Sequence, residues 1–442
     1  GSIKTATFTA ANGEGYFCNT SGGAFTVNLP AGSAGAIVSV QDYNNSLSAL
    51  KDLSITPNGS EKINGGTAGG SITLSTAGEG ITLVYIDGTV GWRSIQDSTF
   101  TEQGVVPAYI TATGGTITTV CTNFKVHTFT GPGTFCVSAG AGNLAKAEYL
   151  VIAGGGGGGA SSAGSVWGAA GGGAGGYRES SGASAGCYSV SPLGACVSSI
   201  AITPGAYPIT VGGGGTGGAA TTNCSPACTA AATNGNNSIF STITSAGGGK
   251  GGSRQTNSSN PAPSAQDQAK GGDGGSGGGS GFSSSAGYLG GAGNTPPVSP
   301  PQGNNGARTA SSDGGAPTCV PGGGGGATAA GQTGPAPGND PTSATLGVGG
   351  AGATSSINGT PTARAGGGGA GGAHPCQSGA AGGSGGGGAG GSNAGGAGVT
   401  GTAGTANTGG GAGGSSGRTN PSPGAAGANG GSGIVIIRYR FQ

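Results

Sequence analysis

Apolar and polar residues alternate along short runs in the first 153 residues of the chain, and turn residues separate the runs. Alternation with a period of two is typical of β-strands that bury one face. Asp87-Gly88 lies between two such runs and predicts a hairpin. The pattern predicts an all-β N-terminal domain, sandwich-like or jelly-roll-like, with eight strands at Ile3–Thr9, Gly15–Asn19, Ala24–Leu29, Ala36–Asp42, Leu53–Thr56, Ser71–Ser75, Ile81–Ile86 and Gly91–Gln96.

A second β unit follows a polar link near residues 97–104. Gly131-Pro132-Gly133 separates two alternating runs, 125–129 and 134–137, and this arrangement predicts another hairpin. The strands expected in this unit are Tyr109–Ala112, Thr116–Thr119, Lys125–Thr130, Gly133–Val137 and Glu148–Ile152.

Glycine runs recur through residues 154–433, separated mainly by Ala, Ser, Thr, Asn and Pro. Glycine and proline make up about 31% of the chain, as in low-complexity sequences, but only 7% of the residues are charged, unlike a solvated disordered tail. A region with so few large side chains cannot build an ordinary apolar core. Any ordered structure in this region therefore requires backbone packed against backbone. The run 154–159 breaks the strict third-residue glycine rule of collagen. We therefore predict a bundle of extended polyglycine-II-type helices whose N–H groups point to carbonyls of adjacent helices.

Short apolar segments interrupt and border the glycine runs. Ile200–Ile202 and Tyr207–Val211 flank Pro204-Gly205, which predicts a hairpin. Tyr149–Ile152 and Ile434–Ile437 stand at the two borders, and we expect these strands to pair and close the domain. The predicted organisation is a β-sandwich domain at 1–103, a small β unit at 104–153 and a glycine-rich domain with a terminal strand at 154–442, with essentially no α-helix.

The charge pattern argues against several functional classes. The formal net charge is +1, and the local basic cluster, Arg438 and Arg440, alternates with apolar residues as in a half-buried strand, so no nucleic-acid partner is predicted. We expect the two histidines, His127 and His374, to be surface or hydrogen-bonded residues, because neither accompanies a placed nucleophile; no enzyme and no cofactor is predicted. GxGxxG matches arise by chance in so much glycine. We find no run of 18 apolar residues and no signal peptide, and predict no membrane insertion.

The nine cysteines leave at least one without a partner in the chain. A zinc site at Cys224 and Cys228 would need His374 and Cys376 as further ligands, and we expect no metal there. Local pairs are candidate disulfides in an oxidising exterior: Cys121 with Cys136, Cys187 with Cys196, and Cys224 with Cys228.

Several motifs combine apolar strands and glycine runs in a fixed order over about three quarters of the chain. They resemble the glycine-rich domain of bacteriophage tail fibre proteins, and the first hundred residues are similar to β domains of marine phage tail fibres. The matching motifs are 109–115 (YITATGG), 125–130, 133–135, 149–154, 202–205, 209–212 and 431–439, together with 23–30, 63–65 and 81–92 near the N-terminus.

The resemblance implies a homotrimeric virion tail protein that joins other tail proteins and binds a host cell-surface receptor, a glycan or an outer-membrane protein. It also implies a polyglycine-II sandwich, as in the distal adhesins of some T-even-like phages, with loops between glycine segments contacting the host; the loops 177–211 and 219–246 are longer here. Aromatic residues in this region either contact the receptor or fill gaps in the bundle: Trp167, Tyr177, Tyr188, Phe282 and Tyr288. The alternative function is a secreted or cell-surface filament or surface-layer protein without a specific receptor, and ice binding is a weaker third.

Overall fold

The fold is described from a computed structural model of the chain. The structure describes residues 2–48, 50–95, 108–161, 167–184, 188–194, 197–220, 231–253, 268–281, 289–309, 320–334, 346–372, 377–393, 397–417 and 424–442. These residues are nearly all in strands or extended segments, with two short 3-10 turns, η1 (Gly142–Leu144) and η2 (Pro192–Gly194). The prediction of an essentially helix-free, all-β chain is confirmed for the described residues.

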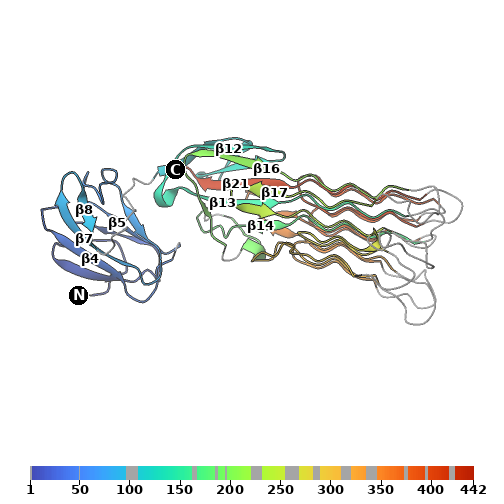
Figure 1. The fold of residues 1–442 in the computed structure, drawn as a ribbon, viewed down its shortest axis with the longest axis horizontal. Helices are drawn as coiled ribbons and strands as arrows, with labels where there is room; N and C mark the ends of the chain where they lie inside the picture. Colours follow the sequence, from blue (N-terminus) through green and yellow to red (C-terminus); the bar gives the residue numbers. More distant parts are fainter. Residues whose placement is uncertain are drawn as a thin grey trace.

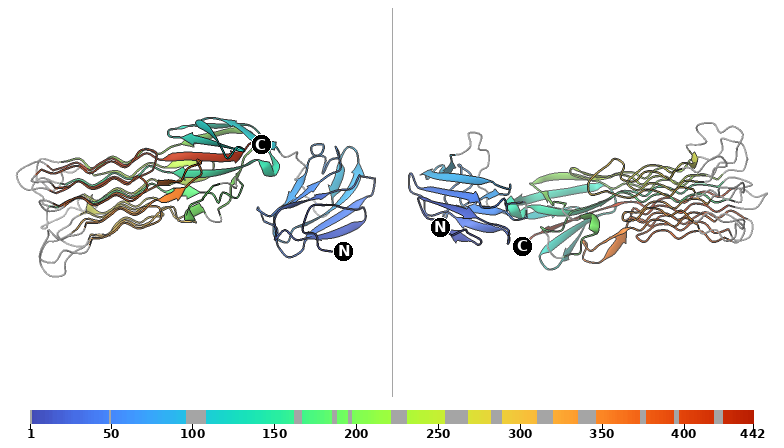
Figure 2. Two further views of the ribbon diagram at one scale, coloured as in Figure 1. Left: turned by 180° about the vertical axis from the view of Figure 1, so that it is seen from behind. Right: turned by 90° about the horizontal axis from the view of Figure 1, so that it is seen from below.

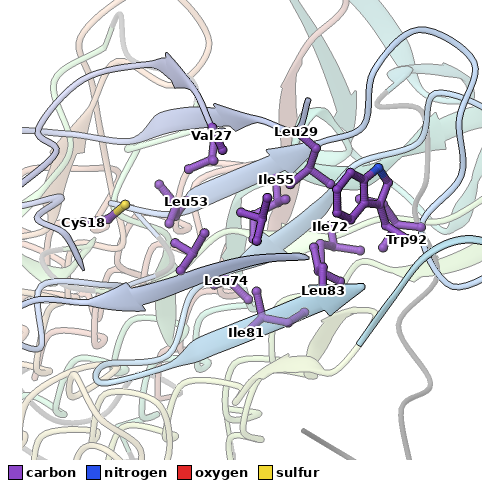
Figure 3. Close-up of a cluster of buried hydrophobic side chains, with 14 of the residues drawn as sticks. Cys18, Val27, Leu29, Leu53, Ile55, Ile72, Leu74, Ile81, Leu83 and Trp92 are labelled. Atoms are coloured by element: carbon purple, nitrogen blue, oxygen red, sulfur yellow. The ribbon is translucent and has the colours of Figure 1, made fainter. Parts of the chain in front are cut away.

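Two four-stranded sheets form the N-terminal part and enclose one apolar core. Val27, Leu53 and Leu83 are fully buried between the sheets, and Trp92 closes one side of the core (Figure 3). The indole Nε1 of Trp92 donates to Glu61 at 3.0 Å, so its polar atom is also satisfied. The sheets are β1 (Phe8–Thr9), β3 (Phe25–Asn28), β5 (Leu53–Thr56) and β6 (Ile72–Leu74), and β2 (Glu14–Cys18), β4 (Ile37–Asp42), β7 (Gly80–Asp87) and β8 (Gly91–Ser94).

The strand pairing in this part agrees with one sequence prediction and corrects another. The hairpin across Asp87-Gly88 is confirmed, because β7 and β8 pair antiparallel. The strands β1 and β3, β3 and β5, and β2 and β4 pair in parallel. A jelly roll is built from antiparallel pairs, so these parallel pairs differ from a jelly roll. The predicted arrangement of two packed sheets is still present.

Two further sheets lie at the start of the glycine-rich region and face each other across a second core. Phe135, Phe240 and Tyr439 are fully buried in that core. One sheet has the order β10 (Thr116–Val120), β11 (Phe124–Phe129), β21 (Ile434–Arg440), β13 (Lys146–Ile152) and β14 (Tyr177–Glu179), with β15 (Ile200–Ala201) also on β13. The other has the order β18 (Ile243–Ser245), β17 (Ser238–Phe240), β16 (Gly205–Thr210), β12 (Gly133–Ala141) and β9 (Ala108–Thr113); β19 (Ala353–Ser355) and β20 (Thr362–Arg364) form a separate hairpin.

The predicted pairing of the border strands is confirmed. β21 pairs antiparallel with β13, with Tyr149 opposite Ile437 and Ile152 opposite Ile434. It also pairs antiparallel with β11 on its other side. The strand nearest the C-terminus is therefore an interior strand of its sheet.

The hairpins predicted at Gly131-Pro132-Gly133 and at Pro204-Gly205 are wrong. β11 and β12 belong to different sheets, and β15 and β16 also lie in different sheets. In both cases the chain crosses from one sheet to the other at the turn. Phe129 and Phe135, on either side of the first of these turns, are both buried in the second core between the sheets.

Beyond the sheets the chain runs back and forth in extended segments, which lie side by side and point away from the strands (Figures 1 and 2). We call this array the glycine slab, its end at the strands the proximal end and its other end the distal end. The segments of the slab are 154–161, 168–176, 212–220, 231–237, 246–253, 268–281, 289–293, 303–309, 320–334, 346–352, 365–372, 377–393, 397–417 and 424–433.

The backbone hydrogen bonds of an inner segment rotate among its neighbours with a period of three. The N–H groups of residues 154–159 donate to three other segments in turn, and the carbonyls accept from three more. Six neighbours therefore surround one segment. The N–H groups of residues 154 and 157 donate to the carbonyls of Asn236 and Thr233, those of 155 and 158 to Gly431 and Ala428, and those of 156 and 159 to Gly173 and Ala170. The carbonyls of 154 and 157 accept from the N–H groups of Gly248 and Gly251, those of 155 and 158 from Gly215 and Gly218, and those of 156 and 159 from Ala412 and Ser415.

Glycine is required in the inner segments for space. A Cβ atom on Gly156 would lie 2.1 Å from the carbonyl oxygen of Gly249, and one on Gly172 would lie 2.2 Å from the oxygen of Gly156. Neither glycine has a positive φ, so conformational freedom is not the reason. At these positions the backbones approach too closely for any side chain.

In the outer segments of the slab, every third residue is exposed to solvent. Gly213, Thr216 and Ala219 are exposed along one segment, and Ser378, Ala381 and Ser384 along another, whereas residues 154–161 are all buried. The outward position accepts small side chains because it faces no neighbouring backbone. This exposure repeat agrees with the period of the hydrogen bonds.

Candidate functional site

The distal end of the glycine slab is the first candidate site, because the described segments end there together (Figure 1). Hydrogen bonds hold the segment ends in contact: Ser161 N donates to Ala425 O at 3.1 Å, and Ser253 N donates to Gln268 O at 2.8 Å. Segments far apart in sequence are thus fixed beside one another. The end of the slab is a defined platform.

Small polar side chains stitch neighbouring backbones near the segment ends. Ser253 Oγ accepts from Ala160 N at 3.1 Å, and Ser161 Oγ accepts from Ala425 N at 3.0 Å. Thr309 Oγ1 donates to Gly281 O at 2.9 Å, and Asn393 Nδ2 donates to Gly417 O at 2.9 Å. All four side chains are buried and uncharged, so their contribution is to position the backbone.

Of the five aromatic residues proposed from the sequence, the three that the structure describes do not form one site. Tyr177 is only 1% exposed, and its hydroxyl donates to Glu179 Oε2 at 3.0 Å, which excludes it from direct receptor contact in this structure. Tyr188 is half-buried and packs on a core at the proximal end. Trp167 is half-buried, whereas Phe282 and Tyr288 lie outside the described residues. For Tyr177 and Tyr188 the alternative interpretation, in which aromatic residues fill gaps, fits their positions.

The long stretch 177–211 also lies at the proximal end. Its strands β14 and β15 pair with β13, and β16 pairs with β12. It is therefore part of the sheet layer, because its alternating apolar residues complete the cores there. The stretch 219–246 is in part a slab segment followed by β17 and β18, and its residues 221–230 lie outside the described part.

A buried polar layer lies beneath the sheet of β11, β21 and β13. We define it as Glu148, Glu179, Tyr188, Arg364 and Arg438. Four of these side chains are 5% exposed or less, and Tyr188 is half-buried. The Arg438 guanidinium lies 4.8 Å from the ring centres of both Tyr188 and Phe124, and its Nη1 donates to Ile357 O at 3.3 Å.

The acids of this layer bind backbone N–H groups. Glu148 accepts from Gly182 N at 3.1 Å and from Ser184 N at 2.7 Å. Glu179 Oε2 also accepts from Ser191 N at 3.0 Å, and burial raises the pKa of this carboxyl. The layer ties the loops after β14 and β19 to the sheet. Sequence analysis missed it, although Glu148 within the otherwise apolar run AEYLVI is a visible signal.

The strand of Arg438 and Arg440 is more buried than predicted. Arg438 is 0% exposed, and within the strand Arg440, its last residue, alone is exposed. The reason is its interior position between β11 and β13, with packed layers on both faces. A phosphate-binding role for Arg438 is excluded by this burial.

His127 is a buried, hydrogen-bonded residue. Of the two positions expected for it, at the surface or in a hydrogen bond, the second is confirmed. Its Nδ1 lies 2.7 Å from Gly114 O, and its Nε2 lies 3.0 Å from Tyr439 Oη. A carbonyl only accepts, so the neutral ring carries its proton on Nδ1 and accepts from Tyr439. Burial lowers the pKa of His127, with a smaller contribution from Lys125. His374 lies outside the described residues.

The candidate disulfide between Cys121 and Cys136 is wrong in this structure. Cys121 lies in the turn after β10, Cys136 lies on β12 in the facing sheet, and both are exposed. Cys18 is a buried thiol of the N-terminal core, and burial raises its pKa to about 11. The other candidate pairs, Cys187 with Cys196 and Cys224 with Cys228, lie outside the described residues, as does Cys376.

Within the described ranges, no group of three His, Cys, Asp or Glu side chains is placed to hold a metal ion. The same ranges contain no helix with the length and apolar character needed to cross a membrane.

Residues 128–440 match the sequence model of a family described as a glycine-rich domain. The match covers the slab and the strands from β12 to β21, and it leaves out β9 and β10 of the second pair of sheets. The chain belongs to the glycine-rich domain family. The boundaries of the match fall inside β11 and at the last residue of β21, so the matched region of this chain includes β13 and β21, the paired strands at the borders of the slab. A comparison with curated proteins gave no match.

Proposed function

We propose that this chain is a receptor-binding adhesin of a bacteriophage tail fibre, in which the glycine slab carries the binding surface at its distal end. The stretches that connect the slab segments contact a glycan or an outer-membrane protein of the host. The chain takes a structural and binding role in the virion tail, joined to other tail proteins, and no catalysis is assigned to it.

The observation that supports this proposal is the period-three hydrogen bonding to six neighbours. We infer that the extended segments are polyglycine-II-type helices, which have three residues per turn and no internal hydrogen bonds. A slab cross-linked in this way is stiff, and groups held by a stiff support lose less entropy on binding. Several copies on one particle would add avidity.

The resemblance to tail fibre proteins supplies the phage context for this proposal, whereas the family match supports its glycine-rich domain alone. We further propose that the chain assembles as a homotrimer through its β domains. Light scattering of the purified protein tests this directly: the expected mass is three times that of one chain, and a one-chain mass refutes the trimer.

Adsorption inhibition tests the adhesin proposal. Purified protein should bind host cells saturably and block phage adsorption. The double variant Phe282→Ala with Tyr288→Ala should weaken binding about tenfold, the loss of one or two stacking contacts. The matched control removes two exposed aromatic residues of the N-terminal part, Phe17 and Tyr43, and should bind as the wild type does.

The alternative function is a filament or surface-layer protein without a specific receptor. That function predicts no saturable binding to any host strain and self-assembly of the purified chain instead. Linear, non-saturating cell association would overturn the adhesin proposal in favour of the filament.

A further inference from the structure

Seven Asn-Gly pairs occur in the chain, and all seven lie among the described residues. An asparagine followed by glycine loses its side-chain amide more readily than other asparagines, because the glycine has no Cβ atom to shield its backbone nitrogen. The seven pairs begin at Asn12, Asn58, Asn64, Asn234, Asn305, Asn358 and Asn429. The hydrogen bonds around them separate one pair from the other six.

The loss of the amide requires a free backbone N–H group on the glycine. The glycine nitrogen attacks Cγ of the asparagine and forms a C–N bond, the Cγ–Nδ2 bond breaks, and ammonia leaves with the proton of the glycine nitrogen. Water then adds to one of the two ring carbonyls of the resulting succinimide and opens the ring to aspartate or isoaspartate. A glycine N–H group that donates to a carbonyl must first give up that hydrogen bond, so the bond slows the attack.

Backbone hydrogen bonds hold the glycine N–H group in six of the seven pairs. The N–H groups of Gly13, Gly65, Gly235, Gly306, Gly359 and Gly430 donate to the carbonyls of Ile37, Val90, Gly248, Gly291, Ser356 and Gly215, respectively, at 2.8–3.0 Å. Gly235, Gly306 and Gly430 lie in slab segments, so their N–H groups become free only when neighbouring segments separate.

The asparagine side chain is held as well in five of these six pairs. The Oδ1 atoms of Asn12, Asn64, Asn234, Asn305 and Asn429 each accept from a backbone N–H group at 2.8–3.1 Å. A side chain fixed in this way must also be released before its Cγ atom can meet the glycine nitrogen. Five pairs are therefore held at both reacting groups, and Asn358 is held at its glycine alone.

Asn58-Gly59 is held at neither group. The pair lies after β5 in a turn closed by Glu61 N, which donates to Asn58 O at 3.0 Å, and Asn58, Gly59 and Ser60 are all exposed. Among the described residues, no group accepts from the N–H of Gly59 and none bonds to the side chain of Asn58. Solvent water, the second reactant, reaches both residues.

We propose that Asn58 is a site of spontaneous deamidation, and that the fold protects the other six Asn-Gly pairs from the same reaction. The reaction adds one carboxylate to the N-terminal domain and lowers the formal net charge of the chain from +1 to zero. Isoaspartate also adds one carbon atom to the main chain close to Glu61, whose carboxylate accepts from Gly32 N at 2.7 Å and from Trp92 Nε1 at 3.0 Å. This inference is independent of receptor binding.

Peptide mapping of the folded and the unfolded full-length chain tests the proposal. Both samples are incubated at mildly alkaline pH, and the mass increase of each Asn-Gly peptide is followed with time. In denaturant all seven pairs are free, so we expect similar rates at all seven. In the folded protein we expect Asn58 to keep about its unfolded rate and the other six pairs to react at least about tenfold more slowly, the factor that one hydrogen bond supplies. An Asn58 peptide that is slowed as much as the other six, or a second pair that reacts as fast as Asn58, overturns the proposal.

Asn58→Gln is the matched variant. The longer glutamine side chain places its carbonyl carbon one bond too far for the five-membered ring, and Asn58 makes no described side-chain contact that the substitution would remove. Gly59→Ala is less suitable, because Gly59 has a φ of 55° and an alanine there would be strained. Ion-exchange chromatography of folded protein should show an acidic species that grows with time in the wild type and at least about tenfold more slowly in Asn58→Gln. Equal growth of the acidic species in the two proteins would place the reaction elsewhere and refute the assignment to Asn58.

Discussion

Adding one methyl group inside the slab should destabilise the glycine-rich domain by several kcal/mol. Gly156 lies in a fully buried segment, and an added Cβ would meet Gly249 O at 2.1 Å and Gly249 C at 2.5 Å. Ordinary contact begins near 3.4 Å, so the two backbones must separate by about 1.3 Å. No rotamer change relieves this clash, because both partners are main chain.

The magnitude follows from overpacking and from lost hydrogen bonds. Overpacking a close-packed interior costs about 1–3 kcal/mol. Gly249 O accepts from Gly173 N at 2.8 Å, and a shift above 1 Å stretches that bond past its useful range. A buried polar group left without its partner costs about 1–3 kcal/mol. Gly156→Ala should therefore lower the free energy of unfolding by about 2–6 kcal/mol.

Gly213→Ala is the matched control. Gly213 lies on an outer segment, is exposed, and would place its Cβ no closer than 3.7 Å to Asn236 Nδ2. Neither glycine has a positive φ, so the two substitutions share their backbone effect. We expect Gly213→Ala to change stability by less than about 1 kcal/mol, with a small gain from the less flexible unfolded chain.

Guanidinium unfolding followed by hydrogen-exchange mass spectrometry measures both variants. Hydrogen exchange reports the slab separately from the N-terminal sheets, so the measurement is valid whether or not the two parts unfold together. A Gly156→Ala variant whose slab peptides exchange as slowly as those of Gly213→Ala would refute the conclusion that glycine is needed here for space.

Three further outcomes are expected. A thiol reagent on the folded protein should label Cys136 quickly and Cys18 at least about a hundredfold more slowly, because a buried thiol with a pKa of about 11 is rarely ionised; peptide mapping with equal labelling would contradict the burial. The pKa of His127 is lowered by burial, so the unfolded chain binds a proton first, and stability should fall as the pH drops below about 6.5; His127→Gln should remove this component of the pH dependence in calorimetry, and an unchanged slope would refute it. Arg438→Ala should cost about 3 kcal/mol by removing packing between two rings, whereas Arg438→Met, which keeps the volume, should cost less than half of that in denaturant unfolding; equal losses would show that the charge dominates.

Local patterns predicted the strands well. β5 begins and ends where the alternation places it, and the pairing of 149–152 with 434–437 follows from two apolar runs at the borders of a region that has few others. The turn residues predicted the strand pairing less well. Gly131-Pro132-Gly133 and Pro204-Gly205 are strong turn signals, but a turn does not determine whether the next strand stays in the same sheet.

The contacts of the buried polar layer were beyond the reach of sequence patterns. Arg438 looks like an outward residue on an alternating strand, and only its interior position in the sheet puts it between Phe124 and Tyr188. That position depends on β11, which precedes it by about 300 residues. The two interpretations of Tyr177, receptor contact or gap filling, stayed open for the same reason, since exposure of an aromatic residue depends on which distant segments cover it.

The period of three in the slab sets a rule for how this protein can vary. One residue inserted into an inner segment would rotate every later donor by a third of a turn and aim it at the wrong neighbour, whereas three inserted residues would restore the frame. The stretches that connect the segments are not bound by this three-residue rule. Variants of this chain should therefore differ freely in the length and sequence of their connections, while their segments grow or shrink in whole turns.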